Sequence, residues 1–412
     1  MKSRMLALGL ALAGLGLVMA LTSCSSSSSS PSSSTPGFIY ITTQGDNSLS
    51  EFELNASTGI PAKSGNSIAA GPSGSMPTAM VLSPLGNAIF VANSVPPSSS
   101  APPPAGAISA FTVNSDGSAT TTSGTSAAGQ LPAGLAMDSG GKFLFVANQG
   151  IFTDPASGTI SVFSVQGTTL SEVAGSPFPT ALLSDSTGTG PVALALTPDG
   201  KYLYAASQFT NTVRGFAVDG SGALTPLPAA SYNAGTNPSG VLVTPDGNFL
   251  YVANAGSNSV SAFVICDNPT PDCPVADGHL TEVAGSPFST GLGPRAMAAT
   301  ADKPVSKFLY VMNWQSNQIA EFKIAAGTGV LSANTSATIS TGLNPAGLTL
   351  LTSANPSANA ATTGGTLDYI YAVNNGASTI SAFSFDNTVG VLSIVGTSTV
   401  ATGGQPTAVA GH

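Results

Sequence analysis

The chain has 412 residues and a formal net charge of −9 at pH 7, and only 7% of its residues are charged. Typical globular proteins carry about 25% charged residues, so Ser, Thr, Asn and Gly must cover most of this surface. An acidic chain with so few basic residues repels phosphate backbones, which excludes nucleic acid as a partner. The composition suits a secreted β-rich scaffold and points to no particular chemistry.

The first segment, 1–24, is typical of an export signal. Met-Lys-Ser-Arg is followed by an apolar stretch and then by Leu21-Thr-Ser-Cys24, which fits a lipobox. We expect cleavage before Cys24 and attachment of lipid to its thiol, so that the membrane is a partner. An ordinary signal peptide or an N-terminal membrane anchor is the alternative. The expected location is the outer membrane, the periplasm or the cell surface.

The next segment, 25–37, consists almost entirely of Ser, Pro and Thr. This composition cannot bury a core, so it predicts a flexible tether. The tether would space the folded part, 38–412, from the membrane.

After residue 37 the chain repeats one pair of strands seven times. The first run reads like Phe249-Leu-Tyr-Val-Ala-Asn254, and the second ends in a sequence like Ser261-Ala-Phe263. The aromatic residues at the centre of the first run are Tyr40, Phe90, Phe145, Tyr204, Tyr251, Tyr310 and Tyr371. A period of this length indicates blades or coils in an array, and the apolar runs between Pro-Asp-Gly turns indicate strands.

The two ends of the repeat predict a closed ring. The first unit begins with its aromatic strand at Phe38 and lacks the Pro-led strand that opens other units, such as 238–244. The chain ends with a Pro-led strand, 405–410, that no aromatic strand follows. Pairing of these two fragments would complete the first blade and leave no free edge. We therefore predict an all-β, seven-bladed β-propeller over 38–412 rather than an open solenoid.

The repeat units resemble those of a known family. Leu196-Thr-Pro-Asp-Gly-Lys-Tyr-Leu-Tyr204 and Thr281-Glu-Val-Ala-Gly-Ser-Pro-Phe288 are similar to units of the lactonase-type seven-bladed propellers, which include one kind of 6-phosphogluconolactonase. They also look like the Tyr-Val-Thr-Asn repeats of surface proteins. Such repeats identify a fold strongly and an activity weakly.

The resemblance implies a role for one arginine. In family members with proposed chemistry, a Pro-led strand reads Gly-Pro-Arg-His and the aromatic strand after it ends Asn-Glu. The matching blade here reads Gly293-Pro-Arg-Ala296 and then Tyr310-Val-Met-Asn-Trp314. The resemblance therefore carries over to Arg295, whereas the His and the Glu are absent.

No other blade restores the missing groups. The positions that match the His are Ala79, Gly134, Ala193, Gly240, Ala296, Gly347 and Ala408, and those that match the Glu are Gln44, Ser94, Gln149, Gln208, Ala255, Trp314 and Asn375. None of these side chains can serve as the general base that lactone opening needs to activate water. The sequence therefore identifies no catalytic residues, and it leaves open whether the protein is an enzyme.

A few residues differ from their equivalents in all other blades, so blade geometry does not explain them. Arg295 follows a leading Pro where the other blades have Thr, Ala, Val or Ser, and Arg214 stands in a third strand where they have Ser or Ala. Both are ligand-binding candidates for an anion; an ion pair or plain solvation is the alternative. Trp314, with Gln315 beside it, could stack on a sugar ring at the mouth or pack against a neighbouring blade.

Cys266 and Cys273 lie in a Pro-rich insertion between two strands of one blade. Outside the cytoplasm such a pair most often forms a local disulfide, with two free thiols as the alternative. No further Cys or His lies nearby in the sequence except His279. We therefore expect no metal site, and no cofactor.

These observations lead to one main hypothesis. We expect an exported, lipid-anchored, monomeric propeller that binds a glycan, a small anionic ligand or an envelope protein, with little or no catalysis. The first alternative is a lactone hydrolase of the 6-phosphogluconolactonase type that uses Arg295 and an unidentified base; the second is a purely structural envelope protein. A carboxylate or His beside Arg295 would indicate the enzyme. An open cup with Arg295, Trp314 and neutral amides would indicate the binding protein.

Overall fold

A computed structural model describes residues 37–96, 103–182, 187–267, 273, 275–302, 305–334, 338–352, 367–396 and 400–412. The predicted export signal 1–24, with Cys24, and the predicted tether up to residue 36 lie outside the described residues. The described residues form 32 strands in seven sheets. No helix among them has the length and apolar character needed to cross a membrane.

Each sheet is one blade, and we number the blades along the chain. Blade 1 contains β1 (Phe38–Thr43), β2 (Ser48–Leu54), β3 (Pro61–Ala69) and the C-terminal β32 (Pro406–Gly411). Blade 2 contains β4 (Met76–Leu82), β5 (Ala88–Ser94), β6 (Ala105–Val113) and β7 (Ala119–Gln130). Blade 3 contains β8 (Pro132–Met137), β9 (Phe143–Asn148), β10 (Thr159–Gln166), β11 (Thr169–Glu172) and β12 (Phe178–Pro179). Blade 4 contains β13 (Pro191–Leu196), β14 (Tyr202–Ser207), β15 (Thr212–Val218) and β16 (Leu224–Asn233).

The last three blades have a fourth strand that is split into two pieces, as in blade 3. Blade 5 contains β17 (Pro238–Val243), β18 (Phe249–Asn254), β19 (Ser259–Ile265), β20 (Leu280–Glu282) and β21 (Phe288–Ser289). Blade 6 contains β22 (Pro294–Ala299), β23 (Phe308–Asn313), β24 (Gln318–Ile324), β25 (Leu331–Ala333) and β26 (Ile339–Ser340). Blade 7 contains β27 (Pro345–Leu351), β28 (Leu367–Asn374), β29 (Thr379–Asp386), β30 (Leu392–Ile394) and β31 (Val400–Ala401).

The aromatic strand is the second strand of each blade and forms its core. In β18 every residue is buried, because neighbouring blades cover both faces of the strand, and this explains the continuous apolar run in the sequence. The packing produces separate apolar clusters, each shared by two neighbouring blades, including one between blade 7 and blade 1.

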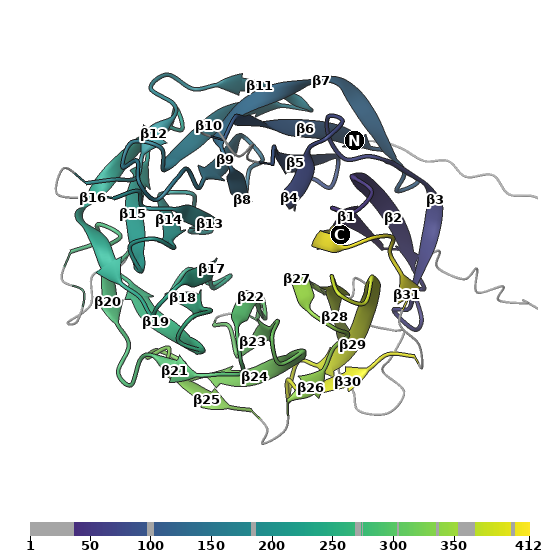
Figure 1. Cartoon of the computed structure of the whole chain (residues 1–412). Coiled ribbons are helices and arrows are strands. Elements are labelled where there is room, and N and C mark those ends of the chain that lie inside the picture. The colour runs from purple at the N-terminus through teal and green to yellow at the C-terminus, as the bar shows by residue number, and fades with distance from the viewer. Residues whose placement is uncertain are drawn as a thin grey trace, which may run out of the picture. The chain divides into compact units, whose positions relative to one another are not determined.

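The predicted closure of the ring is confirmed. β32 pairs antiparallel with β1, from Ile39 opposite Gly411 to Thr43 opposite Pro406. The C-terminal strand thus becomes the inner strand of blade 1, and Figure 1 shows it beside β1. Each inner strand contacts the next one around the ring. The predicted all-β, seven-bladed propeller is therefore correct.

A tyrosine of one blade is hydrogen-bonded to a turn glycine of the next. The Tyr371 hydroxyl of blade 7 donates to the Gly59 carbonyl of blade 1 at 2.7 Å, a second closure of the ring. Equivalent bonds run from Tyr40 to Gly117, from Tyr204 to Gly278, from Tyr251 to Gly329 and from Tyr310 to Gly390. Each of these glycines has a positive φ, which explains why glycine is placed there.

The predicted disulfide is present. It joins Cys266 and Cys273, whose Cα atoms are 5.3 Å apart, in the insertion between β19 and β20. The loop 149–158 connects β9 with β10.

Candidate functional site

Every inner strand is irregular at the same place. Its pairing with the second strand shifts in register directly after the leading Pro, as between Pro294 and Ala296 in blade 6 and at the equivalent point of the other blades. The residue in between has no partner across the sheet, so it forms a β-bulge, a feature that re-aims side chains near functional sites. The bulge residues are Thr78, Ala133, Val192, Ser239, Arg295, Ala346 and Thr407.

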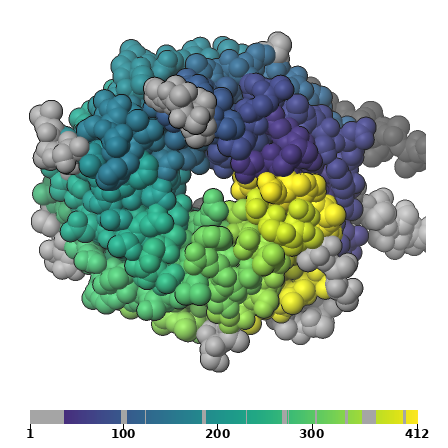
Figure 2. Space-filling view, viewed as in Figure 1, coloured from purple at the N-terminus to yellow at the C-terminus, as the bar shows by residue number. Residues whose placement is uncertain are grey.

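All these bulge residues line one cavity at the centre of the ring. Its lining also includes the inner-strand residues that follow them and the polar side chains at the strand ends; we call it the central cavity. Its volume is about 770 Å³, within the range of about 300–1,000 Å³ that small-molecule sites occupy. Figure 2 shows the opening in the middle of the ring. The repeat position that carries Arg295 therefore faces the cavity in every blade.

Neutral amides surround the end of the cavity where the inner strands begin, which we call the mouth. They are Gln44, Gln149, Gln208, Asn237, Asn344 and Asn375. The Gln149 Nε2 donates to the Gln208 Oε1 at 2.7 Å, and the Gln208 Nε2 donates to the Asn237 Oδ1, which links three blades. Amides offer both donors and acceptors, so they suit the hydroxyl groups of a ligand.

Sequence analysis expected neutral amides around an open cup but named none of these residues as binding residues. It considered Gln44, Gln149 and Gln208 only as positions at which a family Glu is absent. The available signal was the recurrence of Gln at one repeat position in three blades, because blade geometry alone does not require a long amide at a strand end.

Arg295 is the only charged side chain among the described residues that line the central cavity. The side chain is exposed and lines the central cavity. The surrounding strands still exclude part of its water, and this desolvation lowers the pKa of the guanidinium. The group stays protonated at neutral pH, because the usual pKa of arginine exceeds 12. No carboxylate of the described residues forms an ion pair with it. Its hydrogen-bond donors are therefore available to a ligand.

Trp314 enters the cavity from the strand beside Arg295. β22 and β23 pair at Pro294 opposite Asn313, and Trp314 follows directly after β23. Its ring is half-buried and lines the cavity. The indole also packs on the backbone, since a Cβ on Gly293 would lie only 2.6 Å from the Trp314 Nε1. The ring thus packs on its own blade and reaches the cavity, and its stacking on a sugar ring stays a prediction.

The other two predicted ligand-binding residues lie elsewhere. Arg214 is on β15, opposite Ala205 and Ser231 of the neighbouring strands, and it is 2% exposed. Gln315 is exposed but does not line the central cavity. The structure therefore brings Arg295 and Trp314 together and leaves these two apart. The burial of Arg214 excludes plain solvation for that side chain, and Arg214 does not line the central cavity.

The described lining of the cavity contains no Asp, Glu or His. His279 is bonded to Asp277, and His412 packs against the Tyr40 ring; neither lines the cavity. At Gly240, which matches the family His, a Cβ would lie 2.3 Å from the Arg295 carbonyl oxygen, so close strand approach excludes a side chain there. Of the two arrangements that the sequence distinguished, the described residues form the open cup.

Comparisons with solved structures agree with this fold. A candidate 6-phosphogluconolactonase from Bacteroides fragilis is 20% identical over 92% of this chain and 99% of its own, with a TM-score of 0.69. A periplasmic gluconolactonase from Pseudomonas aeruginosa, PpgL, is 17% identical over 91% of this chain and 99% of its own, also with a TM-score of 0.69. At these identities the similarity shows the fold alone.

Sequence comparisons identify the family. No protein of curated function matches the chain. The family model for the lactonase seven-bladed β-propeller matches residues 71–176, 153–270, 180–342 and 272–411, which together span most of the folded part. The chain therefore belongs to the lactonase family of seven-bladed β-propellers.

Proposed function

We propose that the protein binds a small, anionic, hydroxyl-rich ligand, such as a sugar acid, in the central cavity, with little or no catalysis. The observation that carries this proposal is Arg295, a cavity-lining cation that no described acid neutralises, in a chain of net charge −9. The planar fork of an Arg can hold a carboxylate or phosphate through two parallel hydrogen bonds.

The rest of the lining suits the remainder of such a ligand. The amides of the mouth offer donors and acceptors to hydroxyl groups, and Trp314 offers an aromatic face to a sugar ring. Small-molecule sites use a small number of placed polar groups, a charged residue among them, to orient the ligand.

A lactone hydrolase is the second candidate. Its support is the family of the chain and the names of the similar proteins, a candidate 6-phosphogluconolactonase and a periplasmic gluconolactonase. Arg295 could stabilise an oxyanion. A general base, which contributes about 10²–10⁴-fold, would have to come from outside the described lining. That requirement is why binding is the first candidate.

We further propose that the protein works at the cell envelope, anchored by lipid on Cys24. The support is the signal pattern in 1–24 and the disulfide between Cys266 and Cys273, which is typical of oxidising compartments. A glycan or an envelope protein at the mouth would be the partner if the ligand is part of a larger molecule.

Hydrolysis and binding measured side by side separate the two candidates. Wild type and Arg295→Ser are incubated with 6-phosphogluconolactone and with simple γ- and δ-lactones, and binding of gluconate, 6-phosphogluconate and glucose is measured by calorimetry. We expect no turnover above spontaneous hydrolysis, and binding of the acids that Arg295→Ser loses. Turnover that disappears in Arg295→Ser would establish the hydrolase. Failure of wild type to bind any sugar acid would reject the anion site.

A further inference from the structure

The insertion of blade 5 holds a second cluster of chemically active side chains, away from the central cavity. Cys266 follows β19 and His279 precedes β20. The Cys266 amide donates to the His279 carbonyl at 3.0 Å, and the Gly278 amide donates to the Cys266 carbonyl at 2.9 Å. Cys266 and His279 are therefore opposite each other at the base of an antiparallel hairpin, where side chains of facing residues approach closely.

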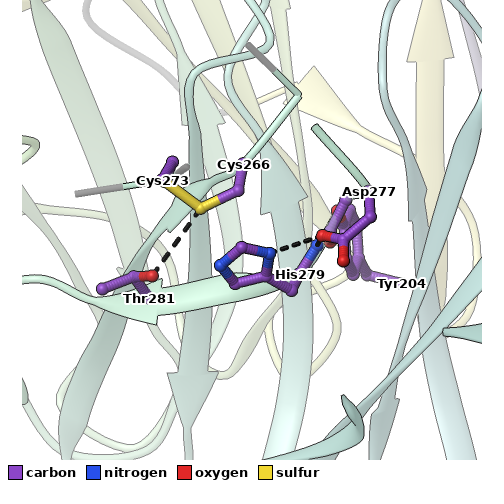
Figure 3. The surroundings of a disulfide bond; sticks show 7 residues. Tyr204, Cys266, Cys273, Asp277, His279 and Thr281 are labelled. Carbon is purple, nitrogen blue, oxygen red and sulfur yellow. Dashed lines mark hydrogen bonds and ion pairs between the residues drawn. A yellow bond between two sulfur atoms is a disulfide. The ribbon is translucent and has the colours of Figure 1, made fainter. Parts of the chain in front are cut away.

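The disulfide brings the other sulfur to the same point. The Sγ atoms of Cys266 and Cys273 and a ring nitrogen of His279 all lie within 4.8 Å of one another, and Figure 3 shows the ring beside the disulfide. In a tetrahedral zinc site with Zn–S bonds of about 2.3 Å, two thiolate sulfurs are about 3.8 Å apart. The three candidate ligand atoms therefore lie close enough together to surround one zinc ion.

The histidine is already oriented as a metal ligand. The His279 Nδ1 is hydrogen-bonded to the Asp277 Oδ1 (Figure 3), and this leaves Nε2 as the nitrogen that can bind a metal. Ligating histidines almost always give their other nitrogen to such a partner, which fixes the ring and raises its basicity. The Thr281 hydroxyl lies 3.6 Å from the Cys266 Sγ, within reach to donate to a thiolate.

Contacts with blade 4 hold the base of the insertion in place independently of the disulfide. The Tyr204 hydroxyl donates to the Gly278 carbonyl at 2.6 Å, and Lys201 forms an ion pair with Asp267 at 3.3 Å. Cys266 and Cys273 are 0% and 1% exposed. Opening the disulfide would therefore leave Cys266 and His279 facing each other in a protected position.

We propose that the reduced protein binds one Zn²⁺ ion through Cys266, Cys273 and His279, so that the disulfide switches a metal site. A dithiol reductant supplies two electrons and two protons: the S–S bond breaks, two thiols form, and the dithiol becomes a disulfide. Zinc then replaces the two thiol protons, which leave to solvent, and a water occupies the fourth position. Sequence analysis expected no metal because it found only His279 nearby; the fold places that residue where a third ligand is needed.

The test compares the oxidised and reduced forms of the same full-length protein. The disulfide is reduced with a phosphine, which is removed without oxygen, and Zn²⁺ alone is added; bound zinc is then measured by native mass spectrometry. We expect one zinc ion per reduced chain and none on the oxidised chain. A reduced, folded chain that binds no zinc overturns the proposal. Because this comparison uses wild type, it does not depend on whether a cysteine variant folds.

Variants then identify the ligands. His279→Gln should abolish stoichiometric binding, and Asp277→Asn should weaken zinc affinity by about 10- to 100-fold, the usual effect of losing the partner of a ligating His. Glu282→Gln is the matched control, since this acid is exposed on β20 and is not part of the cluster, and its zinc affinity should equal that of wild type. Equal zinc affinity in His279→Gln and wild type would show that the site is not the one proposed.

Discussion

Blades 5 and 6 are neighbours with the same strand order, the same split fourth strand and the same tyrosine link to the next blade. They differ in charge and aromatic character at two of the repeat positions that line the central cavity. Blade 5 has Ser239 at the bulge and Ala255 after the second strand, whereas blade 6 has Arg295 and Trp314. Two blades with the same arrangement of strands thus present different side chains to the central cavity.

The difference shows how a repeat protein separates structure from binding. The Ser239 hydroxyl donates to the Pro294 carbonyl of blade 6 at 2.7 Å, and Thr78 makes the equivalent bond to Pro132 at 2.6 Å. At those blades the bulge side chain joins one inner strand to the next. Arg295 makes no such bond among the described residues. At this position of blade 6 the side chain therefore does not join two inner strands, and its polar groups face the cavity.

The largest effect should come from giving blade 6 the residues of blade 5. A charge-assisted hydrogen bond contributes about 1.5–3 kcal/mol and aromatic contact adds about 0.5–1.5 kcal/mol. The double variant Arg295→Ser/Trp314→Ala should therefore bind gluconate about 30- to 2,000-fold more weakly in calorimetry. Its thermal unfolding should match that of wild type, since neither side chain links two blades. A large fall in Tm would show that these residues support the frame after all.

A substitution at the bulge of blade 5 should lower stability without lowering ligand affinity. Ser239→Ala removes the bond to the Pro294 carbonyl and should cost about 1–2 kcal/mol in denaturant unfolding. Gluconate affinity should stay within about twofold of wild type, because the anchor Arg295 keeps its place on β22. If the affinity falls instead as far as in Arg295→Ser, the inner strands do not position the anchor independently.

The tyrosine link should contribute equally in both blades. Tyr251→Phe and Tyr310→Phe each remove one bond of 2.9 Å to a turn glycine of the next blade, and each should lower the free energy of unfolding by about 1 kcal/mol. Blades 2 and 3 already have Phe at this position, Phe90 and Phe145, so the fold tolerates the change. A much larger loss of unfolding free energy in one variant would mean that the tyrosine link does not stabilise the two blades equally.

The sequence predicts the frame well because blade geometry repeats. The aromatic strand centred on Tyr251, the Pro-led strand and the offset of the chain ends each follow from local patterns. It predicts Arg295 and Trp314 for the opposite reason, since each departs from the repeat. Contacts across blades leave no local pattern, so the burial of Arg214 and the amide chain through Gln208 appear only in the structure.

The smallest expected effect concerns Glu321 of blade 6, a buried acid whose equivalent in blade 5 is Ala262. The carboxylate is 6% exposed, accepts one hydrogen bond from the Leu392 amide, and has a buried Oε2 without a partner among the described residues. Burial raises the pKa of Glu321 above its usual value, since desolvation disfavours the charged form. A raised folded-state pKa means that the neutral acid supports the fold and that this support is lost as pH rises through that pKa.

Glu321→Gln removes this titration while keeping an oxygen for the Leu392 amide. The variant should therefore have a slightly higher Tm than wild type at pH 8, and the gap should shrink as pH falls toward about 4.3, the pKa of an unfolded Glu. Glu51→Gln tests the equivalent residue of blade 1, whose pKa burial also raises, and should show the same trend. If the difference in Tm between variant and wild type instead widens as pH falls, the folded protein stabilises the charged carboxylate. The ionised acid would then contribute to the stability of the blade.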